Sequence, residues 1–267
     1  MVSLVGTWMT LMGCTGGPNP ETLVSDLRIL ALVVEPPEAM PGETVVVTAH
    51  VADPTGQGAE MAGWTCGGFG GECLEQDPDR LDLAEGTPPL FSMELMAPVE
   101  AAGILASEEE VAVSVWGLAC EVGVCPLIGE AEASLEVLGD PVTSLEDLPM
   151  EGVALARRSL WVSMRGPEER RKNLEFELGN ELPEDIDASK VDEQQEVSLK
   201  FSVSTDATVA YGLATAGGFT ATEAEVVDGV LEVVWVAPEE TGKVRLWVVF
   251  QDEAAGGAVW SNTILVR

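Results

Sequence analysis

The sequence has little of the chemistry on which most enzymes depend. Its 267 residues include one histidine and one tyrosine, and they contain no Gly-x-Ser-x-Gly elbow, glycine-rich phosphate loop or His-Glu-x-x-His motif. A single histidine rules out most metal and triad chemistry. A carboxylate pair, as used in glycoside hydrolysis, stays open as a minor alternative. With 46 acidic residues, the sequence gives no way to select such a pair.

Basic residues are also scarce. The chain has 13 Lys and Arg against 46 Asp and Glu, a formal net charge of -33. This excess repels nucleic-acid phosphates, so we expect no nucleic-acid partner. No apolar run after residue 13 approaches the roughly 18 to 20 residues of a spanning helix. The apolar content of 46% is normal for a chain with buried cores, and the length fits about two domains.

The start of the chain has the features of an export signal, although no basic residue precedes its apolar run. This run ends in Leu11-Met12-Gly13-Cys14, which resembles the lipobox of bacterial lipoproteins. The resemblance implies a signal peptide at residues 1–13, a diacylglyceryl group on the sulfur of Cys14 and a tether over residues 14–23. Two or more acyl chains anchor a protein stably, so we expect Cys14 to hold the protein at a membrane. The competing interpretation is a buried first strand with a free cysteine.

The other four cysteines form two close pairs, Cys66 with Cys73 and Cys120 with Cys125. In an exported chain this arrangement predicts two disulfides. Four cysteines permit three pairings, and we favour the two local ones because short spacing keeps the thiols close. A zinc site made of four thiolates is the alternative, which the exported context disfavours. Cysteine catalysis would require a reduced and activated thiol.

The rest of the chain predicts an all-β fold of two tandem immunoglobulin-like β-sandwich domains. Short alternating segments are broken by Gly, Pro and Asp, and no long helical period occurs. The predicted strands are 27–34, 43–51, 59–65, 90–96, 111–119, 127–138, 197–203, 208–214, 223–227, 230–236, 243–250 and 258–266. We place domain 1 at residues 24–139, a linker at 140–156 and domain 2 at 157–267. Asp228-Gly229 predicts a tight hairpin turn between two of these strands.

Several residues stand out as candidates for binding or structure. His50 falls on the more polar face of its strand, so we expect an edge or solvent-facing side chain without a catalytic role. Trp64 and Trp116 lie near the predicted disulfides and are expected to pack inside, as in immunoglobulin domains. Asp77, Asp79 and Asp82 suggest a calcium loop but lack the glycine and glutamate of an EF-hand, so solvation is the favoured interpretation and no cofactor is predicted.

A cluster of basic residues follows the predicted linker, comprising Arg157, Arg158, Arg165, Arg170, Arg171 and Lys172. One interpretation is a site for an anionic partner such as lipid phosphate or an acidic glycan. We favour the other, in which these residues pair with acidic side chains of the same chain and orient the two domains.

Two ends of the chain carry a family resemblance. Residues 26–31, 35–38 and 41–45, together with 244–252, 256–257 and 260, are similar to envelope lipoproteins of myxobacterial-type bacteria. The resemblance implies an exported protein with paired immunoglobulin-like domains and carries no activity. We therefore expect a non-catalytic envelope lipoprotein, anchored in the outer membrane through Cys14, that contacts another envelope or extracellular protein or a glycan. The alternatives are a glycan or small-ligand module with exposed tryptophans and a carboxylate-based hydrolase.

Overall fold

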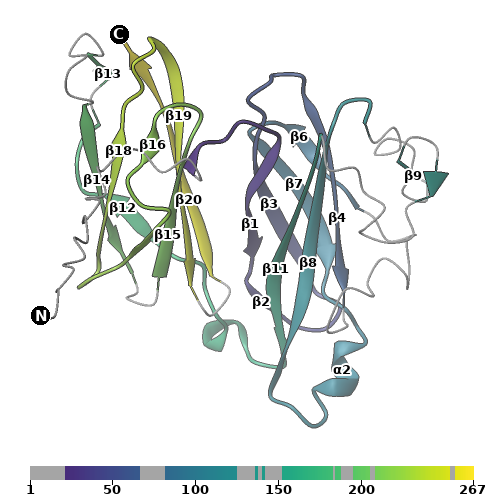
Figure 1. Ribbon diagram of the computed structural model, residues 1–267. Helices are drawn as coiled ribbons and strands as arrows, with labels where there is room; N and C mark the ends of the chain where they lie inside the picture. The colour runs from purple at the N-terminus through teal and green to yellow at the C-terminus, as the bar shows by residue number, and fades with distance from the viewer. Residues whose placement is uncertain are drawn as a thin grey trace, which may run out of the picture.

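The computed structural model places two β-sandwiches side by side (Figure 1). It describes residues 22–66, 82–124, 136–137, 140–141, 152–182, 184–187, 195–204, 208–252 and 256–267. Residues 1–21 lie outside this set, and so does the predicted signal with Cys14. No helix in the described ranges is long and apolar enough to cross a membrane.

Domain 1 consists of two facing sheets. One has the strand order β1-β3-β7-β6 and the other β2-β11-β8-β4-β5. The strands of the first sheet are β1 (Arg28–Glu35), β3 (Thr44–Ala52), β7 (Leu90–Met96) and β6 (Glu85–Thr87). Those of the second are β2 (Glu38–Ala39), β11 (Val153–Ser163), β8 (Glu110–Glu121), β4 (Ala59–Cys66) and β5 (Asp82–Leu83). A short helix, α2 (Ala101–Ile104), precedes β8, and β9 (Glu136–Val137) pairs only with β10 (Asp140–Pro141).

Domain 2 repeats the same plan. Its sheets have the orders β12-β14-β18-β16 and β13-β20-β19-β15-β17. The first contains β12 (Phe176–Leu178), β14 (Glu196–Val203), β18 (Val230–Val236) and β16 (Gly218–Phe219). The second contains β13 (Asp185–Ile186), β20 (Gly257–Val266), β19 (Gly242–Asp252), β15 (Thr208–Ala214) and β17 (Glu223–Glu225).

In both domains the chain starts in one sheet and then crosses to the other. There β2 runs parallel to the last strand β11, and β13 runs parallel to the last strand β20. The remaining ladders are antiparallel, with the crossed connections of an immunoglobulin-like sandwich. The predicted fold class, all-β with immunoglobulin-like domains, is confirmed.

The two cores follow from strand alternation. In β3 the side chains of Val45, Val47, Ala49 and Val51 are fully buried, as their period of two predicts. In β14 the same rule buries Val197, Leu199, Phe201 and Val203. Each set packs against the opposing sheet of its own domain, so each domain has its own hydrophobic core.

The predicted boundary between the domains is wrong. Residues 153–163, expected in the linker at 140–156 and at the start of domain 2, form β11, which pairs along its whole length with β8. Leu160 and Val162 are fully buried in the core of domain 1. The true connection runs from Met164 to Glu175 and includes the 3-10 turn η4 (Pro167–Glu169). The polar composition before β11 was mistaken for a domain boundary.

The turn predicted at Asp228-Gly229 is confirmed, but the hairpin around it is not. Both residues have positive φ, 52° and 73°, as this turn type requires. Val227 and Val230 form a single bridge across the turn. The strand before the turn, β17, pairs with β15. The strand after it, β18, pairs with β14 and β16. The turn therefore carries the chain from one sheet of domain 2 to the other.

An apolar contact joins the two domains. Leu30 and Ala31 of β1 and the neighbouring Ala52 pack against the outer face of β15, β19 and β20. On the domain 2 side this contact contains Trp247, Val249, Tyr211, Leu213 and Val259. Trp247 and Val249 are each only 2% exposed although they point away from the core of domain 2. Domain 1 covers them, so the domains are held together by buried apolar surface.

The segment before β1 also binds domain 2, although residues 14–23 are predicted as a tether. The backbone N–H of Val24 donates to the carbonyl of Ala214 over 2.9 Å, and the N–H of Phe219 donates to the Thr22 hydroxyl over 2.9 Å. Val24 belongs to the apolar contact between the domains. In Figure 1 this purple segment crosses from the yellow-green domain to the purple and teal one.

The connection between the domains is fastened to domain 1 by ion pairs. Arg165 and Arg171 both pair with Glu110 over 2.8 Å, and Arg170 pairs with Glu43 over 2.7 Å. The Arg171 guanidinium also lies 3.8 Å from the centroid of the Trp161 ring. The favoured interpretation of the basic cluster, pairing within the chain, is therefore correct for these three arginines.

Asn173 and Arg158 form hydrogen bonds that join domain 1 and the connection to domain 2. The Asn173 amide donates to the Val34 carbonyl over 2.9 Å, and its oxygen accepts from the N–H of Gly257 over 3.2 Å. Arg158 on β11 donates to the carbonyl of Gly256. Burial lowers the pKa of Arg158, and the nearby Asp252 partly offsets this effect.

Glu38 lies at the centre of the contacts made by the connection. Its side chain is fully buried, accepts hydrogen bonds from the Ser163 hydroxyl and from the N–H of Arg171, and lies 3.5 Å from Arg165. Burial raises the pKa of this carboxyl, but the two hydrogen bonds and the charges of Arg165 and Arg171 outweigh it, so the pKa lies below its ordinary value of 4.5.

We predict that Glu38→Gln lowers the free energy of unfolding by about 2 to 4 kcal/mol at pH 7, because it removes one partner of a buried charge network. The contribution of Glu38 is present above pH 4.5 and is lost as the pH falls through its lowered pKa. Urea unfolding of the wild type and the variant at several pH values measures this contribution to the free energy of unfolding. Wild type and variant should converge in acid, and Glu232→Gln in the exposed pair with Lys200 is the control. A pH-independent difference would contradict the role of the charge.

His50 provides a second measurable group. It is half-buried, lies opposite Ala31 and Leu90, and burial lowers its pKa from 6.5 to about 4. We expect NMR titration of its ring to give a midpoint near pH 4. Because the unfolded chain takes up this proton first, His50 should make stability fall as the pH drops from 6.5 towards 4. His50→Gln should remove this part of the pH dependence of stability. A wild-type ring that titrates near pH 6.5 would refute the prediction.

Candidate functional site

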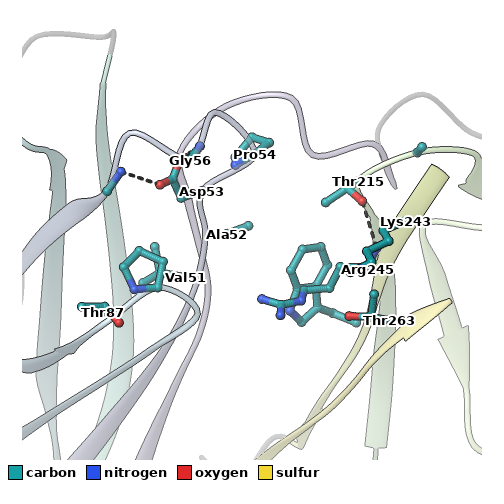
Figure 2. Close-up of a pocket in the computed structure, with 14 residues that line it drawn as sticks. Val51, Ala52, Asp53, Pro54, Gly56, Thr87, Thr215, Lys243, Arg245 and Thr263 are labelled. Atoms are coloured by element: carbon teal, nitrogen blue, oxygen red, sulfur yellow. Dashed lines mark hydrogen bonds between the residues drawn. The ribbon is translucent and has the colours of Figure 1, made fainter. Parts of the chain in front are cut away.

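A cleft of about 700 Å³ lies between the two domains. Domain 1 lines one wall with the end of β3, the loop after it and the turn before β7, and domain 2 lines the other with β19, β20 and the end of β15 (Figure 2). The lining residues are Val51, Ala52, Asp53, Pro54, Gly56, Gly58, Thr87 and Pro88 on the first wall and Thr215, Ala216, Lys243, Arg245, Trp247 and Thr263 on the second.

The wall of domain 1 is a loop shaped by Asp53. Its carboxylate accepts hydrogen bonds from the Thr55 hydroxyl and from the N–H groups of Gly56 and Gly58, all within 2.9 Å. Burial raises the pKa of Asp53, but these hydrogen bonds outweigh it and lower the pKa overall. Gly56 and Gly58 have φ of 68° and 87°, which suits glycine. The Asp53 carboxylate therefore makes these hydrogen bonds within its own loop.

The wall of domain 2 presents alternate residues of one strand. Lys243, Arg245 and Trp247 lie on the outer face of β19, while Val244 and Leu246 point into the core. The N–H of Arg245 donates to the Thr215 hydroxyl over 3.0 Å, which leaves the hydroxyl proton free to donate elsewhere. Thr263 is the partner of Arg245 in the β19–β20 register. Figure 2 shows these residues facing the domain 1 loop.

The wall of domain 2 carries two cations, Lys243 and Arg245. Within the described residues, Lys243 and Arg245 make no ion pair with a carboxylate, whereas Arg165, Arg170, Arg171, Lys200 and Arg267 do. Alternate residues of a strand lie about 7 Å apart, so two positive charges stand close together on one wall. The cleft therefore combines uncompensated positive charge with hydroxyl groups, a combination suited to holding an anion.

Two of the predicted site residues are described, Cys66 and Cys120, and both are buried. In the β4–β8 register Cys66 lies opposite Ser114, six residues from Cys120, which corresponds to about 20 Å along the strand. A disulfide requires Cα atoms within about 7 Å, so these two cysteines are not bonded to each other. Cys14, Cys73 and Cys125 lie outside the described residues, and the two local disulfides stay a prediction.

Trp64 is buried, as predicted, although Trp64 and Trp116 lie on the face of their sheet that points away from the core between the sheets. Trp64 and Trp116 are register partners whose rings stack at 6.1 Å, with 6° between their planes, and the Arg157 guanidinium lies 5.8 Å from the Trp116 ring centroid. Trp64 is only 5% exposed and Trp116 is half-buried. They do not form the open tryptophan platform that a glycan-binding module would use.

The segment with Asp77, Asp79 and Asp82, for which solvation was favoured over calcium binding, is only partly described. Asp82 lies exposed in β5, and Asp77 and Asp79 fall outside the described residues. Within the described ranges no group of three or more His, Cys, Asp or Glu side chains is arranged to hold a metal ion.

No local pattern in the sequence indicates the cleft. Lys243 and Arg245 lie about 190 residues from Asp53, and nothing in either segment indicates that they face each other. One feature of the sequence could have indicated a charged wall. Two cations stand at alternate positions of a predicted strand, which is rare in so acidic a chain.

Comparison with known proteins gives no family for this chain. No family model matches it, and no curated protein does. Among solved structures it is similar to the titin domains Z1Z2, determined in complex with telethonin, with 11% identity over 92% of this chain and 95% of that chain and a TM-score of 0.23.

Two further structures give similar values. For the D00-D0 domain of intimin the identity is 9% over 91% of this chain and 98% of that chain, with a TM-score of 0.28. For the Yersinia pseudotuberculosis adhesin InvE it is 14% over 94% of this chain and 61% of that chain, with a TM-score of 0.24. Because these TM-scores are low, we base the fold on the strand order and register alone.

Proposed function

We propose that this protein is a non-catalytic envelope lipoprotein, anchored to the outer membrane through Cys14, that binds its partner in the cleft between its two domains. The observation that carries the binding role is the composite cleft itself. Its walls come from both domains, and a buried apolar contact and an ion-paired connection fix their relative position. Preorganisation of this kind favours binding because little order is lost when a ligand enters.

The anchor and the cleft are close along the chain. Thr22, whose hydroxyl accepts a hydrogen bond from the N–H of Phe219, follows Cys14 by eight residues. Val24 binds Ala214, which precedes the lining residue Thr215. Eight residues reach at most about 28 Å. An acylated Cys14 would thus keep the cleft near the bilayer surface. The lipobox and the resemblance to envelope lipoproteins support this anchor.

A tryptophan-based glycan site has less support. Trp64, Trp235 and Trp247 are 5%, 0% and 2% exposed, so none presents an open ring face. The described carboxylates with lowered pKa, Glu38, Asp53 and Glu232, act as hydrogen-bond acceptors for their own neighbours and are not gathered around one cavity. We therefore retain the non-catalytic role.

The anchor is tested by the intact mass of the membrane-extracted protein under non-reducing conditions. We expect loss of residues 1–13, added acyl mass and four missing thiol protons from the two disulfides. Cys14→Ser should remove the acyl mass and release the protein from the membrane fraction. An unmodified full-length chain would contradict the anchor and the disulfides together.

The binding role is tested by photo-crosslinking in the intact envelope. A benzoylphenylalanine at Thr263 or Thr87, exposed residues on the two walls, should give discrete crosslinked products. The same group at Ser202, exposed on the far sheet of domain 2, should give none. Ala31→Glu, which introduces a charge into the contact between the domains, should abolish the Thr263 products.

Each outcome of the crosslinking experiment leads to a different conclusion about the binding role. Products at both walls that disappear in Ala31→Glu support binding in the cleft. Products at Ser202 alone would place the interaction elsewhere, and an absence of products at all three positions would overturn the proposed role as an interaction module.

A further inference from the structure

We infer that the ligand of the cleft is a short acidic glycan, whose sugar carboxylates are held by Lys243 and Arg245. This inference rests on the proposed binding function and names its ligand class. Three observations carry it: the uncompensated cations of β19, the hydroxyl and apolar groups around them, and the charge of the rest of the chain.

The two cations need a counter-charge. Lys243 is exposed and Arg245 half-exposed on the same face of β19, and no carboxylate pairs with either in the described part of the chain. Lys172, another cation without an ion pair among the described residues, differs because it lines a second pocket that also contains Glu35, Glu43 and Glu175. Arg28 lies opposite Ala52, a lining residue of the cleft, in the β1–β3 register. An anion between the walls would relieve the repulsion of these groups.

The rest of the lining suits a sugar. Thr87, Thr215 and Thr263 provide hydroxyl groups that both donate and accept hydrogen bonds. Pro54, Pro88 and the edge of Trp247 provide apolar surface between them. A sugar ring presents hydroxyl groups at its rim and C–H groups on its faces, so it matches both kinds of lining. A volume of about 700 Å³ accommodates a few sugar units.

The overall charge limits how acidic the ligand can be. A chain with a net charge of -33 repels a long polyanion before it reaches the cleft. A short ligand with a few carboxylates is repelled far less at physiological salt, where charges more than about 8 Å apart are largely screened. Lys243 and Arg245 can each hold one of these carboxylates. The structure thus favours a short uronic-acid oligosaccharide over a nucleic acid or a highly charged polymer.

Calorimetric titration of the detergent-solubilised lipoprotein with trigalacturonate tests this inference. We expect saturable binding that weakens as salt is raised. Lys243→Gln and Arg245→Gln should each weaken it about ten- to hundredfold, because each removes a charge-assisted hydrogen bond. Lys200→Gln, an exposed cation on the other sheet of domain 2, should leave the affinity unchanged. Equal melting temperatures would exclude misfolding.

Three further ligands decide the chemical class. Neutral maltotriose should bind at least tenfold more weakly than trigalacturonate, and equal binding would overturn the role of the cations. Inorganic phosphate binding as tightly as trigalacturonate would reduce the cleft to a general anion site and overturn the sugar assignment. Tighter binding of tetraglutamate would assign the cleft to an acidic peptide. Failure of all four ligands with retained crosslinks at Thr263 would refute this inference while leaving the proposed function standing.

Discussion

The arrangement of the two domains depends on one buried carboxylate. Glu38 is fully enclosed in β2 and receives hydrogen bonds from the end of β11 and from the connection that follows it. A buried charge is tolerated only when its partners are in place, so the connection has one low-energy path over domain 1. That path brings Asn173 to the position where it hydrogen-bonds to both Val34 and Gly257. The direction in which domain 2 leaves domain 1 follows from this local chemistry.

The apolar contact then determines how closely the domains approach. Trp247 and Val249 belong to a strand whose other face is already in the core of domain 2. Such a strand, apolar on both faces, requires a second covering layer, and β1 of domain 1 provides it. Further along β19 the outward residues change to Arg245 and Lys243, and the walls separate into the cleft. One strand therefore supplies both the contact that joins the domains and the charged wall of the site.

The sequence predicts those parts of the fold and the site that depend on interactions between residues close together in the chain. Strands such as β7 and β15 were predicted at their observed bounds, because burial on one face leaves a local period of two. The turn at Asp228-Gly229 was also correct, since its φ values are a local requirement. The assignment of β11 failed because its polar neighbours resemble a linker and only its pairing with β8 reveals its domain. The cleft depends on residues from both domains, which no local pattern relates.

The distribution of the few cations links the stability of the domain arrangement to the ligand. Arg165, Arg170 and Arg171 are neutralised by acids of domain 1 and hold the connection, whereas Lys243 and Arg245 lie side by side on one wall of the cleft at the same domain junction. An anion bound between the walls contacts both domains only when they are docked. Its affinity and the free energy of docking are therefore coupled, and each must strengthen the other. The excess of acidic residues elsewhere keeps this coupling specific, because it leaves the cleft as a place where a small anion meets two positive charges that no carboxylate of the described residues pairs with.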